Sequence, residues 1–259
     1  CVPRHTIRMR DKVRPDKLRE AVEQALLRFP HMMLTAEPTE TAFRYRRNVQ
    51  PAVVLPFDGV STRYTIGSKD TNGYLFLVGY HEKTIYMEYQ HSISDGRGFE
   101  EFIRCVLFQY LKNCGCPVEN DGTVRGLDTR WSPEESANGY EQLADREFSP
   151  DGIWKKPEAV HAPAVQWSDD AAEVVTEVTF PFSQLHEYAK SIGVSPLSVL
   201  APLMMRAFDR KFGGGDKPVI AEIPVDLRPL LPTVTTRYFI CFIDLPYFPE
   251  YRELPDDEV

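Results

Sequence analysis

The sequence has few cysteines and no long hydrophobic run, and these absences narrow the class of protein. Its five cysteines are odd in number and irregularly spaced, which favours a reducing compartment over a disulfide framework. A membrane-spanning helix needs about 18 or more consecutive apolar residues, and no such run is present. The segment 1–5 does not begin a basic region followed by an apolar one, as a secretory signal would. We therefore expect a cytoplasmic protein with no membrane span.

Positive charge is also scarce. The chain has 30 basic and 38 acidic residues, a net charge of −8, and no stripe rich in lysine or arginine. Because binding to nucleic acid relies on such a basic surface, we expect no nucleic-acid partner. Cys114 and Cys116 lack a second pair at the spacing that metal ligands require, so we expect no metal site.

The most informative stretch is residues 85–111. The residues Ile85 to His91 alternate in a way typical of a strand, with Tyr89 and His91 on one face. From Phe99 onward, apolar residues recur every three or four positions, which predicts an amphipathic helix. The turn between them, residues 92–98, places a histidine and acidic and glycine residues at the end of a strand, where rigid scaffolds often carry catalytic groups.

The six residues from His91 to Gly96 match the pattern H-x-x-x-D-G. In its strand–turn–helix context the match resembles the acyltransferase superfamily of chloramphenicol acetyltransferase, nonribosomal peptide synthetase condensation domains and alcohol O-acetyltransferases. Condensation domains often have two adjacent histidines here, whereas Gln90 precedes His91 in this chain. The first histidine of that pair is therefore missing and the second is kept, which points away from a standard condensation domain.

Two further segments carry the same resemblance. Residues 193–208 look like the helix that opens the second subdomain of these enzymes, and residues 224–229 look like their arginine segment. By this resemblance Arg228 pairs with Asp95 across the two subdomains. The alcohol-acetyltransferase-like branch continues with Thr-x-Arg-Asn, but Tyr238 stands in place of the asparagine.

The resemblance implies an α/β (α+β) fold, the two-layer sandwich of the chloramphenicol acetyltransferase type, with a mixed β-sheet and helices on one face. With 259 residues, the chain is long enough for one large domain or two ordinary ones. We expect an N-terminal acyltransferase subdomain at 1–115, an irregular crossover at 116–172, and the first part of an incomplete C-terminal subdomain at 173–259. The expected helices are 15–29, 183–191 and 195–213, and the expected strands are 2–8, 74–80, 84–90, 174–180, 219–225 and 237–245, with short strands within 42–57.

His91 is the candidate general base. A neutral imidazole has an ordinary pKa of roughly 6.5 and can accept a proton from an attacking hydroxyl or amine near neutral pH. The alternative is a histidine that only hydrogen-bonds its own turn, and the surrounding match favours the base.

The other candidates have supporting roles. Asp95 pairs with Arg228 by the resemblance, or else orients His91 as a dyad. Gly96 allows close approach of substrate or a positive φ, and its amide can meet a developing oxyanion, although an ordinary turn glycine fits equally well. Tyr89, Ser92 and His5 are candidates for lining a channel, with core or turn packing as the alternative for each.

The resemblance therefore implies an acyltransferase that moves an acyl group, with acetyl expected, from a CoA thioester to an alcohol or amine. Gln90 and the segment 224–228 favour the alcohol O-acetyltransferase-like branch. The expected co-substrate is acyl-CoA, no covalently bound cofactor is expected, and the acceptor is a small molecule. A condensation-like domain that uses a carrier-protein phosphopantetheine thioester is one alternative, and a noncatalytic binding module of the same fold is another. The superfamily includes trimers and monomers, so the resemblance favours no oligomeric state.

Overall fold

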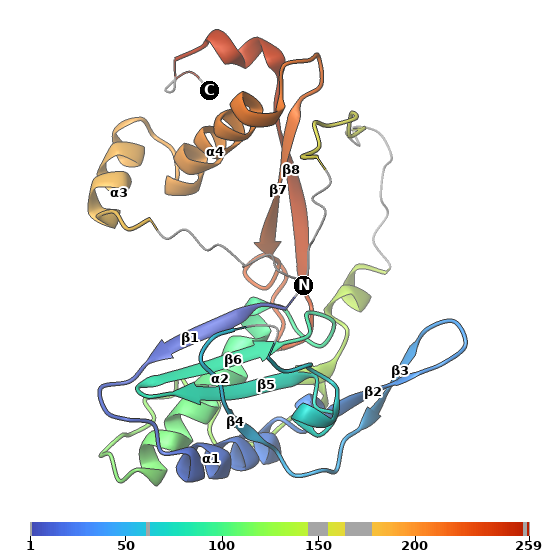
Figure 1. The fold of residues 1–259 in the computed structure, drawn as a ribbon, viewed down its shortest axis with the longest axis vertical. Coiled ribbons are helices and arrows are strands. Elements are labelled where there is room, and N and C mark those ends of the chain that lie inside the picture. Colours follow the sequence, from blue (N-terminus) through green and yellow to red (C-terminus); the bar gives the residue numbers. More distant parts are fainter. Residues whose placement is uncertain (1, 61–62, 145–154, 164–177, 256–257, 259) are drawn as a thin grey trace. The chain divides into compact units, whose positions relative to one another are not determined.

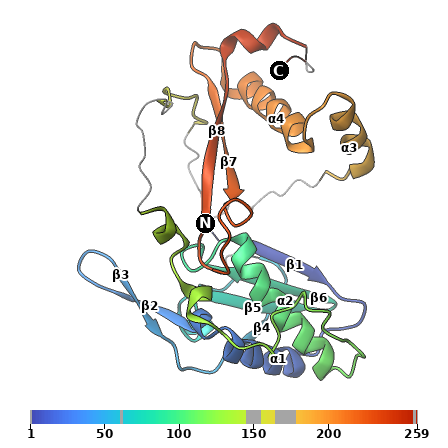
Figure 2. The same cartoon turned by 180° about the vertical axis from the view of Figure 1, so that it is seen from behind.

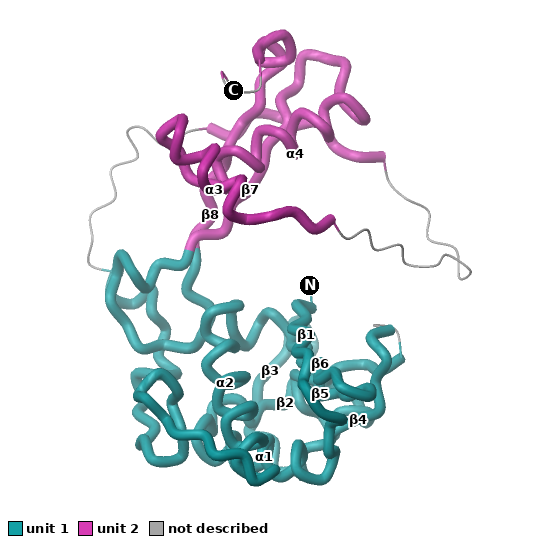
Figure 3. Tube along the Cα trace, turned by 90° about the vertical axis from the view of Figure 1, so that its left-hand side faces the viewer, with its two compact units in different colours: residues 1–146, 226–240 teal, residues 147–225, 241–259 magenta. Residues whose placement is uncertain are grey.

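The computed structural model describes residues 2–60, 63–144, 155–163, 178–255 and 258 (Figure 1). The chain divides into two compact units, coloured separately in Figure 3. Unit 1 contains residues 1–146 and 226–240, and unit 2 contains residues 147–225 and 241–259. The first unit therefore takes a short segment from late in the sequence, and this segment matters for the candidate site.

Unit 1 is built on a four-stranded sheet whose strand order is β1-β6-β5-β4. The strands are β1 (Arg4–Arg8), β4 (Val54–Pro56), β5 (Phe76–His81) and β6 (Thr84–Tyr89). The β1–β6 and β5–β6 pairs are antiparallel, whereas β4 pairs parallel to β5, so the sheet is mixed. Figures 1 and 2 show that α1 (Pro15–Arg28) and α2 (Gly96–Asn113) cover the same face of this sheet. The predicted mixed sheet with helices on one face is confirmed.

The core of unit 1 lies between this sheet and the two helices. Ile85, Met87 and Tyr89 alternate along β6 and are fully buried. Helix α1 begins with Pro15 at its first position, where a missing N–H costs nothing, and it buries its apolar stripe. Helix α2 buries Phe99 as part of the same cluster. Each large apolar side chain removed from water in this way contributes about 1.5–3 kcal/mol.

A second antiparallel pair lies beside the main sheet of unit 1. It consists of β2 (Leu34–Pro38) and β3 (Phe43–Arg47), and all five residues of β3 are exposed. The described part of the expected crossover has no long helix or strand and contains two short 3₁₀ helices. The 3₁₀ helices among the described residues are η1 (Pro30–Met32), η2 (Lys69–Thr71), η3 (Pro133–Ser136), η4 (Gly139–Leu143) and η5 (Pro249–Glu253).

Unit 2 contains α3 (Phe182–Ser191), α4 (Pro196–Phe212) and a two-stranded sheet of β7 (Val219–Asp226) and β8 (Ile240–Tyr247), except that the end residues Asp226 and Ile240 belong to unit 1. The predicted start of α4 is confirmed, because the Ser195 side chain accepts a hydrogen bond from the Ser198 amide. Gly213 follows its last residue and ends the helix, as predicted.

Three details of the sequence prediction for unit 2 differ from the structure. Ser183 lies inside α3, whose N-cap is Pro181. Leu197 and Met204 lie seven residues apart on the apolar stripe that helical spacing predicts to face the core, but they are 51% and 72% exposed. The strand expected at 174–180 lies mostly outside the described residues, and its described part, residues 178–180, is irregular.

None of the described helices is by itself long and apolar enough to cross a membrane. Helices α3 and α4 reach that length and composition only as a pair, with a bend of 97° between them.

Candidate active site

His91 lies in the turn that joins β6 to α2. The strand ends at Tyr89, so the sequence prediction placed His91 on a strand that stops two residues earlier. The imidazole is half-buried and its ring contacts those of Tyr89 and Tyr238, at centroid distances of 5.8 Å and 5.5 Å. Its Nδ1 atom is buried and has no hydrogen-bond partner among the described residues. A buried polar atom without a partner is costly, so a group that hydrogen-bonds to this nitrogen would be favoured there.

Tyr89 presents a second polar atom of this kind. Its ring is fully buried and stacks on Phe99 at 4.0 Å, so the ring belongs to the core. Its hydroxyl oxygen, like His91 Nδ1, has no partner among the described residues. Burial, and secondarily the charge of Asp95, raises the pKa of Tyr89 to about 12. The hydroxyl therefore stays protonated near neutral pH and remains a potential hydrogen-bond donor.

Asp95 holds the turn in place through hydrogen bonds to its carboxylate. Its carboxylate is buried and caps α2, because Oδ1 accepts a hydrogen bond from the Gly98 amide at 2.7 Å. Its Oδ2 accepts from Arg228 Nη1 at 3.0 Å and from the Phe239 amide at 2.8 Å. These donors do not include His91, so the geometry favours the ion pair with Arg228 over an Asp95–His91 dyad.

Arg228 is held by several acceptors of unit 1. Besides Asp95, its guanidinium donates to the carboxylate of Asp226 and to the carbonyl oxygens of Thr235 and Arg237. Both members of the Asp95–Arg228 pair belong to unit 1. We call residues 226–240 the arginine loop, since Arg228 organises it from within.

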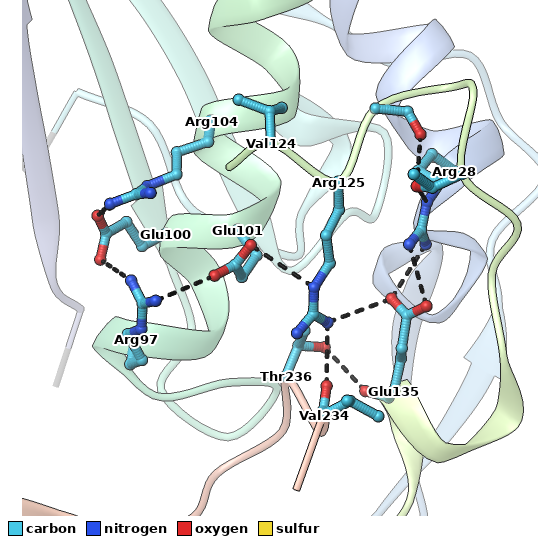
Figure 4. Close-up of polar contacts among 12 residues, drawn as sticks. Arg28, Arg97, Glu100, Glu101, Arg104, Val124, Arg125, Glu135, Val234 and Thr236 are labelled. Atoms are coloured by element: carbon cyan, nitrogen blue, oxygen red, sulfur yellow. Dashed lines mark hydrogen bonds and ion pairs between the residues drawn. The ribbon is translucent and has the colours of Figure 1, made fainter. Parts of the chain in front are cut away.

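The arginine loop is also attached to the turn and to the crossover. Ser94 Oγ donates to the Thr236 carbonyl at 2.6 Å, and the Thr236 amide donates to the Glu135 carbonyl at 2.8 Å. The Glu135 carboxylate in turn accepts two hydrogen bonds of 3.0 Å from the buried guanidinium of Arg28 on α1 (Figure 4). The turn that carries His91 is therefore held through a chain of contacts that ends in the core helices.

The two glycines of the turn differ in what they require. Gly96, singled out by the motif, is exposed and does not have a positive φ. An added Cβ there would meet only the Tyr89 hydroxyl, at 3.9 Å. Gly98 has no such room, since a Cβ would overlap the Thr236 carbonyl and lie 2.6 Å from Ser94 Oγ. The fold thus requires glycine at position 98. At position 96 the fold itself does not require glycine, so a requirement there would come from a substrate that approaches the backbone.

Two adjoining cavities of unit 1 lie next to the turn. A cavity of about 300 Å³ is lined by His31, Leu34, Tyr45, Ser92, Ile93, Ser136 and Arg237. A more apolar one of about 480 Å³ shares Tyr45 and Ser92 with it and extends over Ala36, Phe43, Ile66 and Leu75. Ser92, which was a candidate channel residue, lines both.

His31 is a half-buried histidine that sequence reasoning did not identify. Trp131 Nε1 donates to its Nδ1 at 3.1 Å, so its Nε2 carries the proton and donates to Thr236 Oγ1 at 2.6 Å. Burial, partly opposed by Glu135, lowers the pKa of His31 to about 4. It is therefore a neutral group that supports the arginine loop.

His5 lies near Tyr89. It is half-buried on β1, and its ring lies 6.2 Å from that of Tyr89. Its pKa is lowered, chiefly by burial, with Glu100 acting in the opposite sense. Among the described residues, no group of three or more histidine, cysteine or acidic side chains is arranged to hold a metal ion.

The residues that sequence reasoning missed are His31, Gly98, Thr236 and Arg237. Each acts through a contact with a segment remote in sequence, and neither periodicity nor a motif marks such contacts. A partial signal existed in Thr236 and Arg237, which lie in the segment compared with Thr-x-Arg-Asn.

Comparison with known proteins identifies the fold. No family model and no curated protein matches the sequence. Among solved structures, polyketide synthase associated protein 5 from Mycobacterium tuberculosis is similar, with a TM-score of 0.61 and 16% identity over 99% of this chain and 66% of its own. The first condensation domain of the calcium-dependent antibiotic synthetase, in complex with a substrate analogue, is similar with a TM-score of 0.54 and 15% identity. The match covers 95% of this chain and 64% of that domain's chain.

A third solved structure is the starter condensation domain of rhizomide synthetase in complex with C8-CoA, at a TM-score of 0.53 and 16% identity over 95% of this chain and 61% of its own. The chain thus spans between 61% and 66% of the length of these three proteins. At such identities the likeness concerns the fold. The fold implied by the H-x-x-x-D-G resemblance is confirmed as that of condensation domains and related proteins.

Proposed function

We propose that this chain contributes to acyl transfer from a phosphopantetheine thioester to a hydroxyl or amine, with His91 as general base. The observation that carries the proposal is the half-buried imidazole of His91, with its unpartnered Nδ1, in an H-x-x-x-D-G turn that Asp95 and Arg228 hold in place. Proteins of the same fold include a starter condensation domain with C8-CoA and a condensation domain with a substrate analogue. These neighbours favour the condensation type over alcohol O-acetylation.

The reaction needs one proton carrier. The imidazole of His91 accepts the proton of the acceptor hydroxyl or amine as the acceptor oxygen or nitrogen bonds to the thioester carbonyl carbon. The tetrahedral intermediate then breaks its carbon–sulfur bond, and the imidazolium returns the proton to the leaving thiolate. General-base assistance of this kind is typically worth about 10²–10⁴-fold in rate.

The start of α2 suits the charge that develops on the carbonyl oxygen. The N-terminus of a helix has a partial positive charge, which stabilises an anion. Gly96 is the first residue of α2 and is exposed, so a substrate can approach its backbone closely. Asp95 and Arg228 then have a structural role, because they fix this backbone relative to His91.

The test is thiol release by the full-length protein. Octanoyl-CoA, acetyl-CoA and an octanoyl carrier protein serve as donors, each with and without alcohol and amine acceptors. We expect acceptor-dependent release that falls at least a hundredfold in His91→Ala. His81→Ala is the matched control, because His81 is an exposed histidine in the β5–β6 hairpin. Release that His91→Ala leaves unchanged would contradict the role of His91.

A noncatalytic binding module of the same fold is the second candidate. It is favoured by Tyr238, whose ring stands against His91 where the alcohol-acetyltransferase-like branch has asparagine. In that case the protein would bind the thioester without releasing thiol. His91→Ala would then change neither the binding of the thioester nor the absence of thiol release. The binding partner depends on the donor. It is an acylated carrier domain if the donor is a carrier-protein thioester, and a small molecule if the donor is acyl-CoA.

A further inference from the structure

Arg237 differs from the other arginines around the turn in having no carboxylate partner. Figure 4 shows the network of Arg97, Arg104 and Arg125, each of which is paired with Glu100, Glu101 or Glu135. Arg237 forms no ion pair with any described residue, and its guanidinium makes one long hydrogen bond of 3.4 Å to the Ser136 carbonyl. It is exposed and lines the 300 Å³ cavity.

The cavity that Arg237 lines is suited to an anion. Arg28 and Arg125 are each paired with Glu135, and Arg125 also with Glu101, whereas no described carboxylate offsets the charge of Arg237. The hydroxyl of Ser92 lines the same cavity and makes no hydrogen bond with any described residue, so it remains available to a ligand. A guanidinium and a hydroxyl are donors that a carboxylate accepts well, and a planar guanidinium can hold both carboxylate oxygens.

The adjoining cavity supplies an apolar site of matching size. Its volume of about 480 Å³ falls in the range of small-molecule pockets, roughly 300–1,000 Å³. Phe43 and Tyr45 of β3 form one wall, and both side chains are exposed, at 71% and 41%. Because Tyr45 and Ser92 line both cavities, a molecule can place its charged end by Arg237 and its apolar part along β3.

Both cavities lie next to the candidate base. Ser92 follows His91 in the chain, and Tyr238, the residue after Arg237, has its ring 5.5 Å from that of His91. We propose that the two cavities form one acceptor subsite for a molecule with a carboxylate and an apolar side chain, in which Arg237 binds the carboxylate. The assignment as acceptor rests on the proposed acyl transfer, whereas the binding itself does not.

A phosphate group could use the same guanidinium, and the apolar cavity argues for a carboxylate on an apolar body instead. Equilibrium binding to the full-length protein distinguishes them with three probes: 2-hydroxy-4-methylpentanoate, its uncharged amide and inorganic phosphate. We expect saturable binding of the acid, at least tenfold tighter than that of the amide or phosphate. Equal binding of acid and amide, preferential binding of phosphate, or no binding of the acid would each overturn the proposal.

Variants at Arg237 test the residue itself. Arg237→Gln is expected to weaken binding of the acid at least tenfold and to leave binding of the amide unchanged, while Arg237→Lys restores part of the affinity. Arg8→Gln, an exposed arginine on β1, is the matched control and should change neither. The side chain of Arg237 is exposed, so the melting temperature should stay that of the wild type. Unchanged affinity in Arg237→Gln would remove Arg237 from the subsite.

Steady-state kinetics test separately whether the subsite holds the acceptor of the acyl transfer. If the wild type acylates the hydroxy acid, Arg237→Gln should raise the KM for that acceptor with little change in kcat. If the wild type releases no thiol, the acyl-transfer function fails, and the binding measurements still decide whether the subsite exists. The two proposals therefore fail independently.

Discussion

Asp95 and Arg228, which are 133 residues apart in sequence, are joined by an ion pair of 3.0 Å in which one carboxylate oxygen is shared with the Phe239 amide. The other oxygen holds the Gly98 amide at the start of α2. One buried carboxylate thus holds three donors, one at the start of α2 and two in the arginine loop, and so joins the turn after His91 to that loop. Asp95 therefore positions the backbone next to His91. The imidazole of His91 itself contacts the rings of Tyr89 and Tyr238.

The first prediction concerns the carboxylate of Asp95. Asn in its place has a single acceptor oxygen, so at least one of the three donors would face an NH₂ group. We expect Asp95→Asn to lower the free energy of unfolding by about 1–3 kcal/mol, because a buried donor is left without an acceptor, while the half-buried guanidinium of Arg228 keeps Asp226. Urea unfolding of the full-length protein measures this. Asp11→Asn, at an exposed position, is the control, and a loss below about 1 kcal/mol in Asp95→Asn would contradict the structural role.

The second prediction separates the two glycines of the turn. Gly98→Ala should destabilise unit 1 by about 1–3 kcal/mol, because the new methyl group overlaps the Thr236 carbonyl and pushes the arginine loop away from Ser94. Gly96→Ala should leave stability unchanged or raise it by up to about 1 kcal/mol, since the position is helical and open. Thermal unfolding of the two variants provides the comparison. Equal destabilisation would mean that the arginine loop does not pack on Gly98.

Much of unit 1 could be predicted from the sequence, because its signals are local. Alternation from Ile85 to Tyr89 and the three-to-four-residue spacing after Phe99 are consequences of strand and helix geometry, and both elements are present. The capping of α2 by Asp95 follows from the same local chemistry. In unit 2 the pattern was less reliable. Met204 is apolar and falls at helical spacing, yet it is exposed, whereas Arg206 on the same helix is buried.

The surroundings of the site could not be predicted because they depend on contacts between distant segments. His31 meets Trp131 and Thr236, which are 100 and 205 residues away. Each residue gives no signal alone, since a histidine after a helix and a threonine in a loop are common. The family resemblance supplied the Asp95–Arg228 pair, but the requirement for Gly98 appears only when the Thr236 carbonyl is seen against it.

The third prediction uses the protonation of His31. Its pKa is about 4 in the folded protein and near 6.5 when unfolded, so above pH 6.5 both states are neutral and its contribution to stability is complete. Between pH 6.5 and about 4 the unfolded state binds a proton that the folded state does not, so the free energy of unfolding falls with falling pH. The expected loss is on the order of 3 kcal/mol, and it ends below about pH 4.

His31→Gln isolates this effect from that of the titrating carboxylates. Denaturant unfolding at several pH values should show a shallower decline for the variant than for the wild type between pH 6.5 and 4. Nuclear magnetic resonance of the imidazole gives the folded-state pKa directly. Parallel stability profiles, or an imidazole that titrates near pH 6.5, would contradict the neutral, doubly hydrogen-bonded His31.

The last prediction concerns the hydroxyl of Tyr89, for which Tyr74 is a natural control. Both tyrosines are buried in unit 1, but the Tyr74 hydroxyl donates to the Gln50 carbonyl at 2.8 Å and the Tyr89 hydroxyl has no partner among the described residues. Tyr74→Phe removes a satisfied hydrogen bond and should lower the free energy of unfolding by about 1 kcal/mol. Tyr89→Phe keeps the stack on Phe99 and removes only an unsatisfied group, so stability should be unchanged or rise by up to about 1 kcal/mol.

Thiol release then tests whether the Tyr89 hydroxyl donates a hydrogen bond to the substrate. With a pKa of about 12 it stays protonated and can donate to the substrate near Gly96, so Tyr89→Phe should lower acceptor-dependent release at least tenfold while Tyr74→Phe leaves it near the wild-type rate. A stable Tyr89→Phe protein with full activity would assign the hydroxyl to no reaction step. A Tyr89→Phe protein as destabilised as Tyr74→Phe would mean that the hydroxyl already has a partner in the folded state. Stability unchanged with activity lost is the combination that follows from an unpaired donor beside His91.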